Sequence, residues 1–360
     1  MIRPIKLLVI LMSSTLLPDG AAQSAHRAAG LALRWERLPD VAGPTGLKGM
    51  YGGVSGDRVL LAGGSNFPVP QRAGGRKQFH AAIYVRAIDA RPDVGWTSAT
   101  ERLPDGRGEG ASVTALGGVV AIGGDDGTGP IADVVLLRWN AATGRVDVSA
   151  LPQLPEPAGN AAATVVGPWL YVAGGMGRAR SLATFWRLNL DTSASGWETL
   201  AAWPGPPRFG GMLVPVDTPA GLHLWWAGGI EGPARSQQDY LRDAYLFDPR
   251  QRRWRRAATL PRGAVLGSAL AAGPGRVVVL GGSDGHDFAQ MREQGDRYRL
   301  PGDVLAYDGH ADRWATVGAM PLGVAGAAVV PVGARWWVAG GEYSPGLRTP
   351  QVHVLEINAP

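Results

Sequence analysis

A short hydrophobic run that ends in two glycines recurs six times along the chain, and this recurrence constrains the fold more than any other feature. The runs read VLLAGG, VVAIGG, LYVAGG, LWWAGG, VVVLGG and WWVAGG. The glycine pairs are Gly63-Gly64, Gly123-Gly124, Gly174-Gly175, Gly228-Gly229, Gly281-Gly282 and Gly340-Gly341, separated by 60, 51, 54, 53 and 59 residues. A repeat of this length indicates one array of similar units, not several unrelated domains.

Each unit contains the parts of a propeller blade. Most glycine pairs are followed by a loop, an aromatic strand such as Tyr245-Leu246-Phe247, and a tryptophan such as Trp254. The interval is close to the ~50 residues of a kelch repeat, and four short strands with packed aromatics are typical of a blade. The 53 glycines and 28 prolines agree with many short strands and tight turns. The sequence therefore predicts an all-β fold, a six-bladed kelch-type β-propeller.

The two ends of the chain predict how the ring closes. After the sixth glycine pair one strand remains, Val352 to Ile357, and its closing tryptophan is missing. The missing piece stands at the other end as Trp35-Glu36-Arg37-Leu38-Pro39. We expect the N-terminal strand to complete the C-terminal blade, which would hide two strand edges that promote aggregation. Residues 27–360 then form a single domain.

The first 22 residues predict an export signal. Arg3 and Lys6 precede an apolar stretch, Leu7 to Leu17, that is too short to span a bilayer, and small residues follow at Gly20-Ala21-Ala22. We expect a periplasmic or secreted protein without a membrane partner. The chain has no cysteine, so it forms no disulfide. Its net charge is +5 without a basic stripe of interleaved aromatics, and we expect no nucleic-acid partner.

Propeller topology predicts where a ligand site lies. The loops between second and third strands, and the segments that join blades, meet on one face around the central channel. Several polar residues fall there: Lys48, Asn66, Arg107, Glu109, Asp125, Asp126, Asn160, Arg208, Glu231, Asp284, His286 and Glu342. Such a ring suits a small polar ligand, although aspartate and asparagine also favour ordinary turns.

The most distinctive segment is GGEYSPGLRT, residues 340–349. A Pro-Gly turn separates Glu342 from Arg348 and can bring the two side chains together over the channel. This segment resembles the signature loop of bacterial N-acetylneuraminate epimerases, the sialic acid mutarotases. PGPPRFGG around Arg208 and GLKGMYGG around Lys48 are also similar to that family. The resemblance covers essentially the whole mature chain, but only the loop of Glu342 is specific.

The chain departs from the usual family pattern in two ways. The signature loop lies in the last blade instead of the middle of the chain, so the sequence resembles the cyclically permuted mutarotase branch. A long insertion that helps to cover the site in the family is shortened here to roughly His286 to Pro301.

The resemblance implies an isomerase that interconverts the α and β anomers of a sialic acid such as N-acetylneuraminate. Glu342 would be the base, and Arg348 with Arg208 would bind the sugar carboxylate, because a guanidinium presents paired donors. We expect the catalytic pair Glu342 and Arg348, and substrate contacts from Lys48, Asn66, Arg208 and His286. The acid is open between His286, Tyr343 and an ordered water. No metal or cofactor is expected, and we expect a monomer or weak homodimer.

Other functions compete with this one. A carbohydrate-binding propeller without catalysis stays open, since a fold does not determine function. A lyase, or a mutarotase for a neutral sugar, is also open, although a neutral substrate would need the arginines less. A copper radical oxidase is excluded, because its cofactor requires a cysteine crosslinked to tyrosine and the chain has none.

Overall fold

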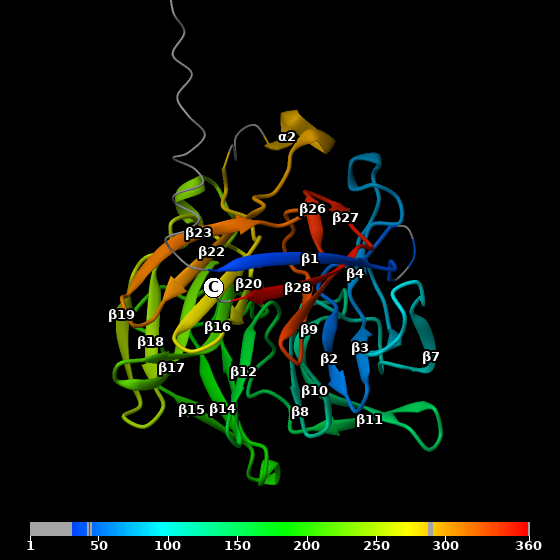
Figure 1. Cartoon of the computed structure of the whole chain (residues 1–360), viewed down its shortest axis with the longest axis horizontal. Helices are drawn as coiled ribbons and strands as arrows, with labels where there is room; N and C mark the ends of the chain where they lie inside the picture. Colours follow the sequence, from blue (N-terminus) through cyan, green and yellow to red (C-terminus); the bar gives the residue numbers. More distant parts are fainter. Residues whose placement is uncertain (1–30, 42, 44, 287–290, 359–360) are drawn as a thin grey trace, which may run out of the picture.

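The computed structural model describes residues 31–41, 43, 45–286 and 291–358. The expected export signal, residues 1–22, lies outside this range. The described residues form six antiparallel sheets of four strands each, the blades of a β-propeller (Figure 1). Two further two-stranded sheets lie in loops. The predicted all-β, six-bladed propeller is confirmed.

The blades are numbered one to six along the chain. Blade one holds β2 (Tyr51–Ser55), β3 (Arg58–Ala62), β6 (Ala82–Ala87) and β7 (Thr97–Arg102), and blade two holds β8 (Ala111–Ala115), β9 (Gly118–Asp125), β10 (Pro130–Asn140) and β11 (Arg145–Leu151). Blade three holds β12 (Ala162–Val166), β13 (Trp169–Ala173), β14 (Phe185–Asn189) and β15 (Trp197–Leu200), and blade four holds β16 (Phe209–Thr218), β17 (Gly221–Ile230), β18 (Ala244–Asp248) and β19 (Arg253–Ala257). Blade five holds β20 (Ser268–Ala271), β21 (Arg276–Leu280), β22 (Asp303–Asp308) and β23 (Arg313–Ala319), and blade six holds β24 (Ala328–Val332), β25 (Arg335–Ala339), β28 (Val352–Asn358) and β1 (Ala32–Leu38).

The ring closes through the two ends of the described chain. Strand β1 pairs antiparallel with β28, from Ala32 opposite Asn358 to Leu38 opposite Val352. Figure 1 shows β1 in blue beside β28 in red. The indole Nε1 of Trp35 donates a hydrogen bond to the carbonyl of Ala319, at 3.0 Å, and so ties β1 to blade five. The predicted closure is confirmed.

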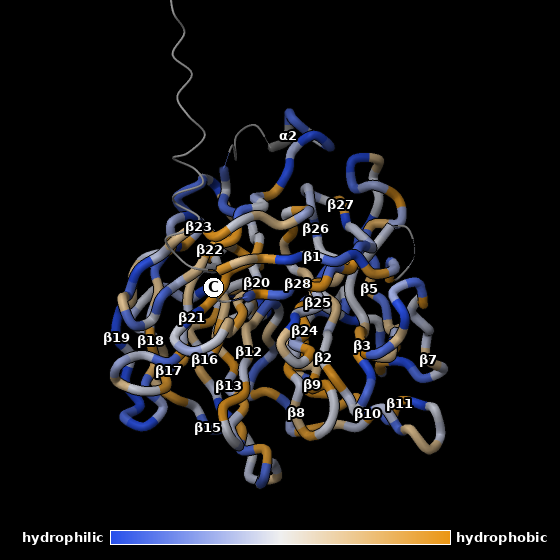
Figure 2. The backbone as a smooth tube through the Cα atoms, viewed as in Figure 1, coloured by the Kyte–Doolittle hydropathy of each residue, from blue (hydrophilic) through white to orange (hydrophobic). Residues whose placement is uncertain are grey.

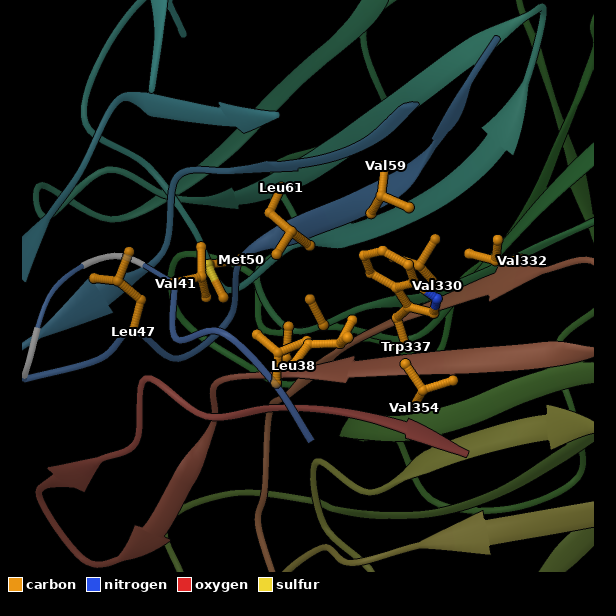
Figure 3. Packing of buried hydrophobic residues seen from close by; sticks show 13 residues of the cluster. Leu38, Val41, Leu47, Met50, Val59, Leu61, Val330, Val332, Trp337 and Val354 are labelled. Atoms are coloured by element: carbon orange, nitrogen blue, oxygen red, sulfur yellow. The ribbon is translucent and has the colours of Figure 1, made fainter. Parts of the chain in front are cut away.

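Hydrophobic packing between neighbouring blades forms the core. At the seam between blades six and one, Leu61 of β3 and Val330 and Trp337 of blade six belong to one buried cluster (Figure 3). Trp96 meets Trp337 edge to face, with ring centroids 6.0 Å apart. Figure 2 shows hydrophobic residues concentrated along many inner strands, whereas the outer strand β19 is hydrophilic. Because each blade packs on two neighbours, the ring is one continuous unit.

The recurrent glycine pairs have a common structural reason. Each pair ends a second strand where the next inter-blade segment passes close by. The N–H of Gly64 donates to the carbonyl of Arg107 at 2.8 Å, and that of Gly175 donates to Arg208 at 2.8 Å. A Cβ at Gly63 would lie 2.3 Å from the Arg107 carbonyl oxygen. Glycine is therefore required by the close approach of two backbones.

Helical structure is scarce in the described ranges. It comprises α2 (Met291–Gln294) and the 3₁₀ turns η1 (Gln71–Ala73), η2 (Ser193–Ser195), η3 (Gln237–Asp239) and η4 (Gly295–Arg297). None of the helices in this part of the chain is both long and apolar enough to cross a membrane.

Candidate functional site at the channel mouth

The second-to-third-strand loops of blades five, six and one gather at one end of the channel. The loop of blade six folds into the hairpin of β26 (Glu342–Ser344) and β27 (Leu347–Arg348), and the loop of blade one contains β4 (Ser65–Asn66) and β5 (Gln78–Phe79). In Figure 1, β26, β27 and α2 lie above β1 and β28. These loops surround the mouth of the channel, as propeller topology predicts.

A cavity of about 190 Å³ occupies the channel beneath this mouth. The first strands of all six blades, or the residues just before them, contribute to its wall, which consists mostly of glycine, alanine and other apolar residues. The polar residues of the wall are Lys48, Glu109, Ser112, Asn160 and Ser268. A small hollow with few polar groups suits a small polar ligand.

Glu342, Arg348 and Lys48 form one ionic cluster beside this cavity. The hairpin places Glu342 opposite Arg348, with 2.9 Å between Oε2 and Nη1. Lys48, from the segment between blades six and one, brings its Nζ to 3.4 Å from the same Oε2. The other oxygen, Oε1, accepts a 3.3 Å hydrogen bond from the N–H of Gly346. The structure therefore brings together three of the residues that the sequence placed at the site.

The guanidinium of Arg348 is almost completely buried, with 3% of its side chain exposed. Its Cζ lies 4.9 Å from the ring centroid of Phe67, so it packs on an aromatic face. Its Nε and Nη1 make no hydrogen bond within the described part of the chain. The contact to Glu342 is thus an ion pair without hydrogen-bond geometry. Buried donors left unused in this way are uncommon and call for a partner.

A second carboxylate, that of Glu109, lies within electrostatic range of Lys48. It accepts hydrogen bonds from Lys77 Nζ, at 3.0 and 3.1 Å, and from Ser65 Oγ, at 2.8 Å. Burial alone would raise the pKa of Glu109, but the charges of Lys48 and Lys77 and these hydrogen bonds lower it to about 2. Glu109 is therefore a fixed anion at the mouth.

The sequence predicted that Glu109 lies on the face around the channel but assigned it no role, and it did not predict Lys77 there. A signal for Lys77 did exist, since the chain has only three lysines, Lys6, Lys48 and Lys77. Two of these three lysines lie at the channel mouth, although nearly all other basic residues of the chain are arginines.

Asn66 is buried and its side-chain amide is already engaged. Its Nδ2 donates to Thr45 Oγ1 at 3.0 Å and to the Gly46 carbonyl at 3.2 Å, and its Oδ1 lies 2.9 Å from His80 Nε2. Burial and the charge of Arg102 lower the pKa of His80. Asn66 was expected to contact substrate, but the structure uses its amide to brace the segment that leads to Lys48.

Arg208 was also expected at the substrate, and the structure gives it another partner. Its fully buried guanidinium forms two hydrogen bonds to Asp243, at 2.6 and 2.7 Å, and one to the Gly228 carbonyl at 3.0 Å. Arg107 contacts Asp133 at 3.0 Å in the same manner, and Arg262 contacts Asp303 at 2.8 Å. An arginine that joins an inter-blade segment to a third strand is thus a repeated device of this fold. None of the Arg208 side chain is exposed to a ligand.

His286 is exposed on the blade five loop, at the edge of the described residues. Its N–H donates to Asp284 Oδ1 at 2.9 Å, and its carbonyl accepts from Tyr298 Oη at 2.8 Å. This loop contacts the hairpin of blade six, since the N–H of Leu300 donates to the Tyr343 carbonyl at 3.2 Å. The loop therefore borders the ionic cluster. Within the described residues no group of three histidine, aspartate or glutamate side chains is arranged to hold a metal.

Comparison with known proteins shows that part of the sequence is similar to the N-acetylneuraminate epimerases. The family model described as N-acetylneuraminate epimerase matches residues 151–294. An N-acetylneuraminate epimerase of Yersinia pestis (strain Pestoides F) is 32% identical over 226 residues, 56% of this chain and 56% of the relative. That of Haemophilus influenzae (strain PittEE) is 28% identical over 232 residues, 58% of this chain and 60% of the relative. The chain thus spans somewhat more than half the length of the curated relatives it matches.

A solved structure described as "Structure of YjhT" matches the fold with a TM-score of 0.66 and 16% identity, over 89% of this chain and 99% of that chain. At this identity the likeness concerns the fold alone. The family match covers blades three and four and part of blade five, whereas Lys48, Glu342 and Arg348 lie outside it. The resemblance expected from the loop of Glu342 is confirmed by an independent part of the chain: in the sequence of residues 151–294 this protein is similar to the N-acetylneuraminate epimerases, and its propeller fold matches that of YjhT.

Proposed function

We propose that the protein is an anomeric epimerase that interconverts the α and β forms of a sialic acid such as N-acetylneuraminate. The observation that carries the proposal is the carboxylate of Glu342, which contacts both Arg348 and Lys48 beside the channel cavity. The relatives named N-acetylneuraminate epimerase support the same reaction. A carboxylate base flanked by two cations suits a substrate that is itself a carboxylic acid.

The reaction opens the hemiketal ring and closes it on the other face. A base removes the proton of the anomeric hydroxyl while an acid protonates the ring oxygen, so that the C–O bond of the ring breaks and a carbonyl forms. Closure reverses both transfers. Each positioned proton transfer contributes about 10²–10⁴-fold to the rate.

We assign the base to Glu342, and its oxygen Oε1 in particular. Both cations lie nearest Oε2, whereas Oε1 accepts only a long hydrogen bond, at 3.3 Å from the Gly346 N–H, within the described residues. Oε1 is therefore the oxygen that can take a proton with least loss of protein contacts. Lys48 and Arg348 then bind the sugar carboxylate. The proton donor to the ring oxygen is His286, Tyr343 or an ordered water.

The changed order of the blades is compatible with this site. Because β1 completes blade six, the ring has no gap, and the blade at which the chain begins does not alter how Lys48 meets Glu342. We propose that the chain is a cyclic permutation of the usual epimerase. We further propose that it acts in the periplasm or outside the cell, on the strength of the signal-like residues 1–22.

Proton NMR of freshly released α-N-acetylneuraminate tests the function. The approach to the β anomer is followed with the protein and in buffer alone, since the spontaneous reaction is appreciable. We expect a rate that exceeds the buffer control and scales with protein concentration. A protein that binds the sugar acid without accelerating this reaction would instead be a carbohydrate-binding propeller.

A further inference from the structure

A closed ring of backbone hydrogen bonds surrounds the channel just below its mouth. One residue from each inter-blade segment takes part, and we call these six residues the collar: Gly49, Glu109, Asn160, Gly210, Leu266 and Gly326. Each N–H donates to the carbonyl of the preceding member, and that of Gly49 donates to Gly326, with distances from 2.5 to 2.8 Å. All six backbone donors and acceptors are consumed in this ring. No backbone N–H of the collar is therefore left to donate to a ligand, and polar donors from the collar must come from its side chains.

Every collar residue has a left-handed backbone, with φ between 49° and 67°. Glycine adopts this conformation without strain, and three of the six positions are glycine. Glu109, Asn160 and Leu266 occupy it with a side chain, which costs free energy for any residue except glycine and least for asparagine. Strain of this kind persists where the side chain serves a purpose.

For two of the three strained residues, the side chain makes contacts with other residues of the protein that explain the strain. Leu266 packs against the small hydrophobic clusters that include Val265 and Leu300. Glu109 accepts hydrogen bonds from Ser65 and Lys77. The side-chain amide of Asn160, by contrast, makes no hydrogen bond within the described residues, although it is half-buried and lines the cavity.

The order of the ring places Asn160 across the channel from the ionic cluster. Three steps around the six-membered collar separate Asn160 from Gly326 in either direction. The residue before Gly326, Ala325, pairs with Glu342 through two backbone hydrogen bonds, at 2.8 and 2.9 Å. Glu342 and Asn160 therefore stand on opposite sides of the mouth.

We propose that Asn160 is a substrate-contacting residue. This inference rests on the proposed function and extends it. With the anomeric carbon at Glu342, the opposite side of the sugar ring faces Asn160. The amide can donate through Nδ2 and accept through Oδ1, which complements an acylamino group or a pair of hydroxyls on that side. Asn160 then determines which sugar acids bind, and takes no part in proton transfer.

The variant Asn160→Gly separates a ligand contact from a structural role. Glycine is the residue that the collar backbone prefers, so the variant should fold with an unchanged or higher thermal midpoint. Calorimetric titration with N-acetylneuraminate should nevertheless show binding weaker by about threefold to tenfold, as expected for a lost neutral hydrogen bond. Asn160→Asp keeps the shape but replaces the donor with an anion, and should also weaken binding.

Leu116→Gly is the matched control. Leu116 has a φ of 54° in the turn between β8 and β9, and it is not part of the cavity wall. This change relieves the same backbone strain and should leave the affinity unaltered. A sialic acid with a hydroxyl in place of its acetamido group gives a second control. If Asn160 contacts the acetamido group, wild type should prefer the acetamido sugar, and Asn160→Gly should lose that preference.

The outcomes separate this inference from the proposed function. Equal affinity of Asn160→Gly and wild type for both sugars would overturn the role of Asn160, whether or not wild type accelerates anomerisation. Wild type that binds the sugar without accelerating its anomerisation would refute the epimerase activity, while weaker binding by Asn160→Gly would still establish the contact. Wild type that binds neither sugar would overturn both proposals.

Discussion

Glu342 and Arg348 face each other across the β26–β27 hairpin, with 2.9 Å between Oε2 and Nη1. Lys48 reaches the same oxygen from the opposite end of the chain, at 3.4 Å. The first pairing is local, whereas the second exists only because the ring closes and sets blade six beside blade one. The candidate site thus depends on a short hairpin and on the closed propeller together.

Replacing the base should abolish catalysis without abolishing binding. Glu342→Gln keeps the size of the side chain but cannot accept a proton, so the anomerisation rate should fall by about 10²-fold or more. Sugar affinity should change little. NMR rates above the buffer control, measured beside calorimetric titration, test both parts. Equal rates for wild type and Glu342→Gln would refute the assignment of the base.

Arginine should be required at position 348 for binding an acid. Arg348→Lys keeps the charge but loses the planar pair of donors that suits a carboxylate. We expect affinity for a sugar acid to fall by about 1.5–3 kcal/mol, the worth of a hydrogen bond to a charged group. Calorimetry with the acid and its neutral amide checks this. Wild type that binds the two ligands equally would argue against a carboxylate site.

Glu109 should make the protein sensitive to acid. Its pKa is lowered from 4.5 to about 2 in the fold, so its ionised form stabilises the native state. That stabilisation, on the order of 3 kcal/mol, is complete above about pH 4.5 and is lost as the pH falls toward 2.

Urea unfolding of wild type and Glu109→Gln between pH 7 and pH 3 measures this effect. The difference in unfolding free energy should be constant above about pH 4.5 and shrink below it. A difference that does not vary with pH over this range would show that the charge of Glu109 is not what stabilises the mouth.

Arg208 should matter for stability. Arg208→Leu leaves the carboxylate of Asp243 in its partly buried position without its cation, and breaking such a pair costs about 3–5 kcal/mol. Thermal or urea denaturation measures the loss. The double variant Arg208→Leu with Asp243→Leu should recover part of it, because no charge is then left unpaired. A single variant as stable as wild type, with weakened sugar binding, would instead place Arg208 at the substrate.

Removal of the closing strand should cause aggregation. A chain that begins after residue 38 lacks β1, so the edge of β28 becomes available to other molecules. Size-exclusion chromatography with light scattering should detect oligomers or aggregates. A chain that begins at residue 27 is the control and should remain dispersed. A monomeric, stable protein without β1 would contradict the role of this strand in closing the ring.

Local and periodic features were predictable from the sequence. The six glycine pairs mark close backbone contacts that only glycine allows, and their repetition predicts the blades. The unmatched Trp35 at one end and the incomplete repeat at the other predict the closure that β1 and β28 make. The approach of Glu342 to Arg348 followed from a Pro-Gly turn between them.

The partners of the remaining polar residues were decided by tertiary structure. The local sequence does not show that the guanidinium of Arg208 is bound by Asp243, whereas the Nε of Arg348 is left without a hydrogen bond within the described residues. Both are arginines in glycine- and proline-rich loops. The side-chain amide of Asn66 is likewise engaged by its neighbours Thr45 and His80.

Through its repeats and its mismatched ends, the sequence alone determined a closed six-bladed ring and a carboxylate–arginine hairpin on one face of it. Only the tertiary structure decided that Lys48 joins this hairpin and that Lys77 binds Glu109. It also decided that Asn160 lies across the channel from the hairpin, with a side-chain amide that makes no hydrogen bond within the described residues. The physical reason is that a repeat can be recognised from short-range patterns of residue types along the chain. The pairing of buried charges depends instead on which loops from distant blades meet after the ring has closed.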